Sequence, residues 1–146
     1  MRLLLFFVGL TAFAQVQRLE IAFTGVNCEP CLESLPGRAK RIRGVTEASL
    51  DAKAGILKLA MAPVNRVRIE QFRDIVEQDG TKAVRAPLVE IRGTIDGEGK
   101  LTVPEHPRPY TLESAKPLAA GPVSIKGTIE DLKTMRIKVS EVSVLR

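Results

Sequence analysis

The sequence predicts an α+β protein whose two halves differ in character. Between Val16 and Ala86 the apolar residues alternate between a period of two and a period of 3.6, as strands and amphipathic helices require. After Pro87 no helical periodicity is present, and short apolar runs with internal glycines follow one another. The 146 residues suffice for one domain or two small ones, and 45% hydrophobic with 27% charged residues describe a globular chain.

The first half is expected to follow the order β-α-β-β-α-β. Residues 19–23 alternate apolar and other side chains, as a half-buried strand does. Gly44 and Gly80 are the expected ends of two helices, and Asn65 is the expected N-cap of the second helix. Strands are predicted around residues 19–23, 45–50, 57–61 and 81–86, and helices around residues 32–42 and 65–80. This order is the split β-α-β arrangement of ferredoxin-like folds.

The second half is predicted to be a small all-β domain, either barrel-like or OB-like. Val89–Ile95 recurs as Val123–Ile129, and both segments read Val-x-Ile-x-Gly-Thr-Ile. The internal glycines, Gly93 and Gly127, indicate bends or bulges, which favour a barrel over a sandwich. A β-unit of about 60 residues buries little core by itself, so we expect it to pack against the first half.

Residues 1–14 are expected to be a signal peptide. Arg2 gives a positive start, residues 3–10 are apolar, and Ala12–Ala14 forms an A-x-A cleavage site, so the mature chain would begin at Gln15. A buried first strand or helix is the alternative. No apolar run reaches the roughly 18 residues of a membrane span, so stable membrane insertion is not expected. The predicted location is therefore periplasmic or secreted, where two cysteines can form a disulfide.

The chemistry of the chain is concentrated in a C-x-x-C pair, Cys28 and Cys31, between the first predicted strand and the first predicted helix. The helix dipole and the free N–H groups at a helix N-terminus lower the pKa of a nearby thiol. Two adjacent thiolates favour soft ions, and Cu(I) and Hg(II) accept two ligands, whereas a structural zinc site usually has four. The pair therefore predicts a metal site, with a disulfide formed after export as the alternative.

The segment Gly25–Cys31, followed by Gly44 and Val45, resembles the heavy-metal-associated domain family. That family includes copper chaperones, amino-terminal domains of copper-transporting ATPases and the periplasmic mercury-binding protein. Its members share a G-M-x-C-x-x-C loop, a G-V pair after the first helix and the β-α-β-β-α-β order. The resemblance covers residues 16–86 of this chain. It implies that residues 15–86 form one metal-binding domain, followed by a β-domain of unknown role at residues 87–146.

The resemblance also implies a site and partners. Cys28 and Cys31 would bind a heavy-metal ion, Cu(I) first, with Hg(II) and Zn(II) as alternatives, and would exchange it with a metal-donor or metal-acceptor protein. Val26 stands where the family has Met, so the apolar character of that position is kept. Lys82 would balance the negative charge of a bis-thiolate complex, as a lysine does in eukaryotic chaperones.

Other residues are weaker candidates. His106, the only histidine, is expected to be a loop residue, and Met61 a core residue; they are the first candidates if a third ligand is needed. Four basic residues on the first predicted helix form either a solvated face or a surface that docks an acidic metal-binding domain of a partner. These residues are Arg38, Lys40, Arg41 and Arg43.

The composition argues against several classes of function. With one Tyr, no Trp and 4% aromatic residues, the chain lacks the stacking platforms of nucleic-acid modules. With one His, most hydrolytic mechanisms have no base, and the predicted order of elements is not that of a thioredoxin-like oxidoreductase. We therefore expect an exported metal carrier or buffer that is not an enzyme. The rival hypothesis is a non-metal interaction module whose two cysteines form a disulfide.

Overall fold

The computed structural model describes residues 16–25, 28–78, 81–83, 86–103, 108–131 and 133–145. The predicted signal peptide and His106 lie outside these residues. The helices and strands are β1 (Val16–Thr24), α1 (Glu29–Lys40), β2 (Val45–Asp51), β3 (Ile56–Met61), α2 (Ile69–Glu77), β4 (Lys82–Ala83), β5 (Leu88–Ile95), β6 (Lys100–Thr102), β7 (Tyr110–Glu113), β8 (Gly121–Asp131) and β9 (Arg136–Val144). Within the described residues, neither helix has the length and apolar character needed to cross a membrane.

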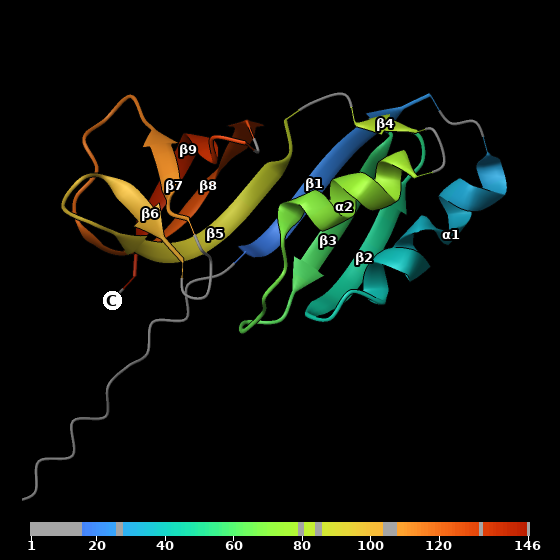
Figure 1. Cartoon of the computed structure of the whole chain (residues 1–146), viewed down its shortest axis with the longest axis horizontal. Coiled ribbons are helices and arrows are strands. Elements are labelled where there is room, and N and C mark those ends of the chain that lie inside the picture. Colours follow the sequence, from blue (N-terminus) through green and yellow to red (C-terminus); the bar gives the residue numbers. More distant parts are fainter. Residues whose placement is uncertain are drawn as a thin grey trace, which may run out of the picture.

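The first half has the predicted ferredoxin-like topology. Its strands lie in the order β4-β1-β3-β2, and each neighbouring pair is antiparallel. Figure 1 shows α2 in front of β1 and β3, with α1 beside β2. Leu35 of α1 and Phe72 of α2 are buried because they face the apolar side of β1, where Leu19 and Ile21 have no exposed surface. The sheet and both helices therefore share one core.

The first helix ends earlier than expected. The apolar spacing extends the prediction to Ile42, but α1 ends at Lys40. The N–H groups of Arg41 and Ile42 bond to the carbonyls of Arg38 and Ala39, at 3.2 and 3.1 Å. These bonds span three residues, so they tighten the chain into a turn at the end of α1. Ile42 still packs against the core, which explains its place in the apolar pattern.

The predicted role of Asn65 as a helix cap is wrong. The N-cap of α2 is Arg68, and Asn65 is a buried residue of the preceding loop. Its amide nitrogen donates to the carbonyl oxygens of Val16 and Ala62, both at 2.8 Å, and its oxygen accepts the N–H of Val67 at 3.2 Å. Asn65 thus fixes the loop between β3 and α2 to the start of β1.

The second half contains the predicted barrel. Its five strands pair in the closed ring β5-β6-β7-β9-β8-β5. The pair β7–β9 is parallel and the other pairs are antiparallel. Figure 1 shows β5 curving from the edge of the ferredoxin-like half into this barrel. Because the ring is closed, each of its strands has a neighbour on both sides, and few backbone N–H and C=O groups at strand edges are left unpaired.

The two repeated glycines let neighbouring strands approach closely. A Cβ atom at Gly93 would lie 2.6 Å from Cδ1 of Leu101 on β6. A Cβ atom at Gly127 would meet the carbonyl oxygen of Lys138 and lie 2.9 Å from Cγ2 of Ile137, and the β8–β9 register shifts at this glycine. The expected bulge is confirmed there. The two repeat copies pair with each other, in the register Val89–Gly127, Ile91–Ile125 and Gly93–Val123.

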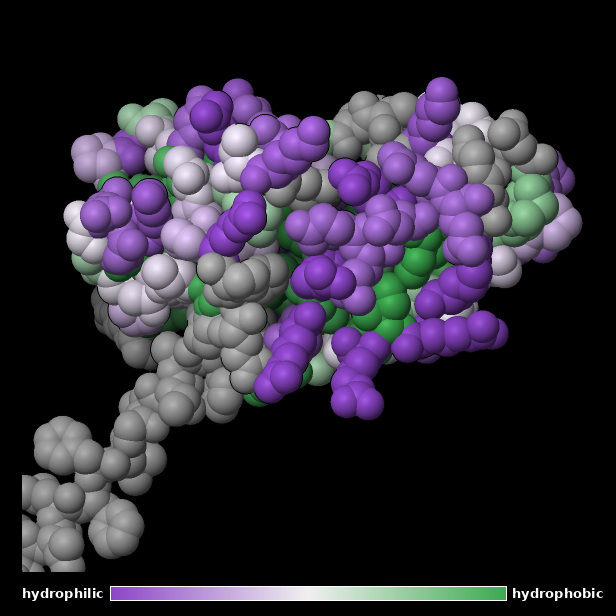
Figure 2. All heavy atoms as spheres, in the orientation of Figure 1, coloured by the Kyte–Doolittle hydropathy of each residue, from purple (hydrophilic) through white to green (hydrophobic). Residues whose placement is uncertain are grey.

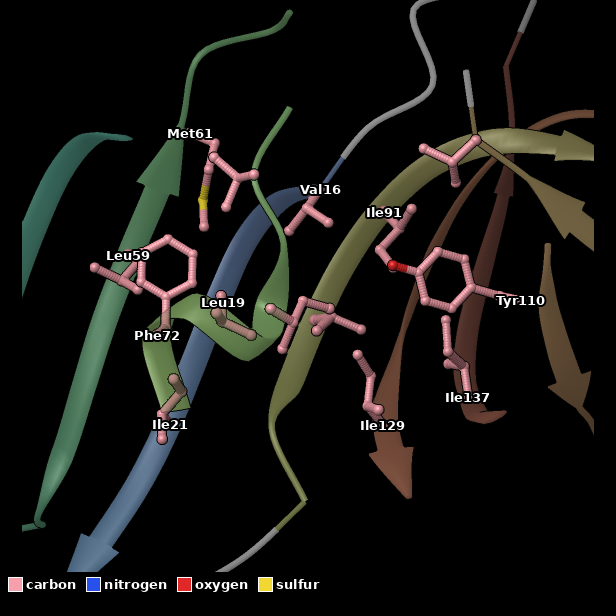
Figure 3. Close-up of a cluster of buried hydrophobic side chains, with 14 of the residues drawn as sticks. Val16, Leu19, Ile21, Leu59, Met61, Phe72, Ile91, Tyr110, Ile129 and Ile137 are labelled. Atoms are coloured by element: carbon pink, nitrogen blue, oxygen red, sulfur yellow. The ribbon is translucent and has the colours of Figure 1, made fainter. Parts of the chain in front are cut away.

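The two halves are joined through a strand pair. β5 pairs with the first half of β1, with Leu19 opposite Val89. Figure 3 shows Val16 of β1 beside Ile91 of β5, with Tyr110 and Ile137 of the barrel on the other side of Ile91. The buried side chains of both halves form one continuous cluster. The barrel therefore packs against the first half, as expected from its small size.

The outer face of this joint carries a row of alternating charges. Arg18, Glu90, Lys126 and Glu141 lie opposite one another on β1, β5, β8 and β9. Arg18 Nε lies 4.0 Å from a carboxylate oxygen of Glu90, and Lys126 Nζ lies 3.6 Å from one of Glu141. Opposite charges across neighbouring strands stabilise a pair modestly and disfavour registers that place like charges together.

Candidate metal site

The C-x-x-C pair lies where the chain leaves β1 and enters α1. Cys28 is the N-cap of α1 and Cys31 lies in its first turn. Gly25, just after β1, has φ +72°, a left-handed conformation that glycine adopts without strain. A Cβ atom there would meet no neighbour, so the start of this loop faces open space. Val26 lies outside the described residues.

The two sulfurs are joined in a disulfide. The Cα atoms of Cys28 and Cys31 are 5.2 Å apart, and both residues are half-buried. Sγ of Cys28 accepts the N–H of Cys31 at 3.2 Å, and the Cys28 carbonyl accepts the N–H of Leu32 at 3.1 Å. Cys28 therefore occupies the position where a capping side chain receives the free N–H groups of a helix. The structure brings the two predicted site residues together in their oxidised form.

Arg38 reaches back along α1 to the C-x-x-C turn. Its guanidinium donates to the carbonyl oxygen of Cys31 at 3.1 Å and to Oε1 of Gln78, just after α2, at 3.5 Å. The hydroxyl of Ser34 donates to the same Cys31 carbonyl at 2.7 Å. Pro36 lies between them in the helix and has no N–H to donate to the carbonyl of Leu32, four residues before it. Arg38 thus places a positive charge at the cysteine turn.

The sequence pattern alone assigned Arg38 to a basic cluster and missed its contact with the site. Residues seven apart lie on the same face of a helix, two turns from each other, and helical side chains point toward the N-terminus. The spacing of Arg38 from Cys31 is therefore the signal that predicts this contact. The other three members of the cluster, Lys40, Arg41 and Arg43, are exposed at the opposite end of α1.

The other candidate ligands lie elsewhere or outside the described residues. Met61 is buried and is the last residue of β3. It lies near the start of β1, whereas Thr24 and the cysteines that follow it lie at the other end of that strand. Lys82 is exposed and pairs with Thr24, so it lies on the cysteine side of the sheet. No group of three or more His, Cys, Asp or Glu side chains in the described residues could hold a metal ion together.

The local chemistry depends on the oxidation state of the pair. As a disulfide the sulfurs carry no charge. After reduction, the N–H groups at the start of α1 and the guanidinium of Arg38 would both stabilise thiolates, because each places positive charge near the sulfurs. The carboxylate of Glu29 in the first turn of α1 opposes this effect, but it is exposed and screened by solvent.

Comparisons with known proteins give matches for half of the chain. No family model matches it, and no curated protein matches it. Among solved structures, a copper-binding domain from HMA7, a P-type ATPase, is 24% identical over 47% of this chain and 90% of that one, with a TM-score of 0.40. The CopZ metallochaperone is 22% identical over 46% of this chain and 98% of that one, with a TM-score of 0.41.

A third solved structure, the yeast copper transporter domain CCC2A, is 18% identical over 47% of this chain and 96% of that one, with a TM-score of 0.40. Each of these three matches spans about half of this chain. The assignment of the fold itself rests on the strand order β4-β1-β3-β2 and its two helices.

Proposed function

We propose that this chain is an exported protein that carries or buffers a soft metal ion, Cu(I) first, through Cys28 and Cys31. The proposed role is binding and transfer, not catalysis. The observation that supports it most is the position of both sulfurs at the N-terminal end of α1, where helix N–H groups and Arg38 favour thiolates. Hg(II) and Zn(II) are the alternative ions, and Zn(II) would need further ligands.

Loading requires reduction. The disulfide takes up two electrons and two protons from a dithiol donor, which is itself oxidised to a disulfide, and Cys28 and Cys31 become thiols. Cu(I) then replaces the two thiol protons, and the complex of one cation and two thiolates carries one negative charge. The guanidinium of Arg38 and the positive end of α1 are placed to stabilise this charge.

Transfer would proceed by ligand exchange with a metal-donor or metal-acceptor protein. A thiolate of the partner adds to the ion to give a transient three-coordinate state, and one of the two original sulfurs then leaves. The cysteine loop suits this exchange because Gly25 opens toward solvent and both cysteines are only half-buried. An acidic metal-binding domain is the kind of partner expected.

Export is part of the proposal. Signal cleavage after Ala14 would leave Gln15 as the first residue and place the protein in the periplasm or outside the cell. Amino-terminal sequencing of exported material tests it. Material that still begins at Met1 would contradict both the cleavage site and the proposed location.

A second candidate function is favoured by the disulfide itself. In this alternative, the cysteines stay oxidised and the chain is a non-metal periplasmic interaction module. Counting free thiols in protein isolated from the periplasm under acid quench separates the two candidates. Two free thiols or one bound metal ion per chain would support the metal carrier. A chain with no free thiol and no bound metal would support the interaction module.

The decisive experiment is anaerobic titration of the reduced protein with Cu(I), Hg(II) and Zn(II) in competition with a chelator. We expect one Cu(I) per chain, and loss of tight binding in both Cys28→Ser and Cys31→Ser, because one thiolate cannot replace two. Met61→Leu is the matched control and should bind as the unmodified chain does. If either cysteine variant kept its Cu(I) affinity, the two-thiolate site would be wrong.

A further inference from the structure

The basic residues that follow α1 belong to a different surface from the cysteines. α1 has 12 residues and therefore spans about 18 Å, so Cys28 at its start and Lys40 at its end lie at opposite ends of the ferredoxin-like half. Arg41 and Arg43 follow Lys40 in the turn before β2. These residues therefore cannot border the cysteine loop, and a role at the metal site does not account for them.

At this far end the structure contains a groove of about 550 Å³, which we call the Arg43–Arg66 groove. Both arginines are exposed, and no acidic side chain is among the described residues that line it. Ile42 and Val64 add an apolar part, and Val64 is 56% exposed. The lining residues are Ile42, Arg43, Gly44, Val64, Asn65, Arg66 and Gln71. Figure 2 shows long hydrophilic side chains along the lower edge of this half, next to an apolar area.

The walls of the groove are held in place by contacts within the fold. Gly44 has φ +103°, and a Cβ atom there would lie 2.8 Å from Cβ of Asn65, so only glycine allows the two walls to come this close. The Gly44 carbonyl accepts the N–H of Ala62 at 2.7 Å. Asn65 in turn bonds to the Val16 carbonyl of β1. A ligand would therefore meet a groove that is already formed, which reduces the entropy lost on binding.

The surroundings add positive potential. Arg68 precedes α2 and is exposed, and the first turn of α2 directs its positive end toward the same side. Glu70 is the acidic residue of that turn. Its carboxylate lies beside the positive end of α2 and offsets part of this potential.

We propose that the Arg43–Arg66 groove binds an acidic peptide segment of a partner protein. Carboxylates of the segment would pair with the two guanidiniums, which present planar donor pairs suited to carboxylates. Its apolar side chains would cover Ile42 and Val64, which a bare phosphate ion or a lipid headgroup would leave exposed. Because the groove lies about 18 Å from the cysteines, a partner bound there leaves the cysteine loop open. The proposal does not depend on the metal-binding function.

The test uses the full mature chain, oxidised and free of metal, and a fluorescein-labelled peptide Leu-Glu-Glu-Leu-Glu-Glu. Fluorescence anisotropy measures its affinity, and the peptide Leu-Gln-Gln-Leu-Gln-Gln is the uncharged control. The variant Arg43→Gln/Arg66→Gln removes both guanidiniums, and Lys53→Gln/Lys133→Gln removes the same charge from exposed positions outside the groove. Circular dichroism melting checks that both double variants fold.

We expect the arginine variant to bind the acidic peptide about tenfold more weakly, and the lysine variant to bind it within about twofold of the unmodified chain. Amide NMR signals of Gly44 and Gln71 should move on binding, and that of Cys31 should not. Equal weakening in both variants would show nonspecific charge attraction and overturn the proposal. It would also be overturned if inorganic phosphate or phosphatidylglycerol vesicles displaced the peptide from the groove, or if the acidic peptide bound no better than its control.

Discussion

Reducing the Cys28–Cys31 disulfide should lower the free energy of unfolding by only about 2 kcal/mol. The bridge joins residues three apart, so it closes a loop of four residues. In the chain-entropy description a loop of this size restricts the unfolded chain by about 1.9 kcal/mol at 25 °C, much less than a long loop does. The protein also has an apolar core away from the bridge in sequence, in which Leu19, Ile21 and Phe72 are fully buried. The reduced protein should therefore stay folded, as the proposed role in carrying a metal ion requires.

Urea unfolding followed by far-ultraviolet circular dichroism, with and without a phosphine reductant, measures this difference. The Cys28→Ser/Cys31→Ser variant is the control and should give the same curve in both solutions. Its stability should match that of the reduced chain to within about 1 kcal/mol, since both lack the cross-link. Loss of helical signal on reduction, or a decrease of more than about 4 kcal/mol, would refute the reasoning, because a four-residue loop cannot supply that much.

Four further predictions test the fold and the site. Asn65→Ala removes three hydrogen bonds, two of them buried, and should cost about 3 kcal/mol in urea unfolding; a cost below about 1 kcal/mol would contradict the anchoring role. Gly127→Ala should cost about 1–3 kcal/mol because its Cβ meets β9, whereas Gly97→Ala, with no neighbour within 4 Å, should cost far less. Arg38→Gln should slow alkylation of the reduced cysteines about twofold to threefold near neutral pH, because it removes a positive charge that stabilises their thiolates; an unchanged rate would contradict this effect of Arg38. Tyr110 is the only tyrosine, and burial followed by the charge of Glu70 raises its pKa, so its contribution to stability is present below the ordinary tyrosine pKa and is lost as pH rises above it. Tyrosinate absorbance should therefore appear together with loss of circular dichroism, and an earlier rise would contradict its burial.

Much of the fold was predictable because it depends on local patterns. The alternation at residues 19–23 and the helical spacing of Phe72 with its neighbours identify β1 and α2, and the repeated glycines identify the barrel. The pairing of β1 with β5 was not predictable from such patterns. It joins segments some seventy residues apart, and the alternation of a strand does not say which other strand it pairs with.

The errors have a physical origin in tertiary contacts. Asn65 has a side chain suited to a helix cap, but its hydrogen bonds to the Val16 and Ala62 carbonyls place it in the core instead. Ile42 fits the apolar stripe of α1 although it follows the helix, since a tight turn can also bury one side chain.

For the candidate site, the short spacing of Cys28 and Cys31 was sufficient to predict their proximity. Their oxidation state was left open, because a C-x-x-C pair at a helix start fits a disulfide as well as a bound metal. The contact of Arg38 depends on side-chain direction along α1 and on Gln78 after α2. Neither is visible in composition or in charge counts.

The pairing of β1 with two successive strands bears on how such a chain can be shortened or recombined. β4 covers only Phe23 and Thr24 of this edge of β1, and β5 covers the stretch from Val16 to Glu20. A fragment that stops at residue 86 would keep the ferredoxin-like order but expose the backbone donors and acceptors of that stretch, and it should self-associate through them. Gene fusions that exchange one half for a homologous module would meet the same difficulty, because the first strand of the barrel also completes the sheet of its neighbour. A functional cysteine-bearing fragment therefore needs either residues 88–91 or a substitute strand.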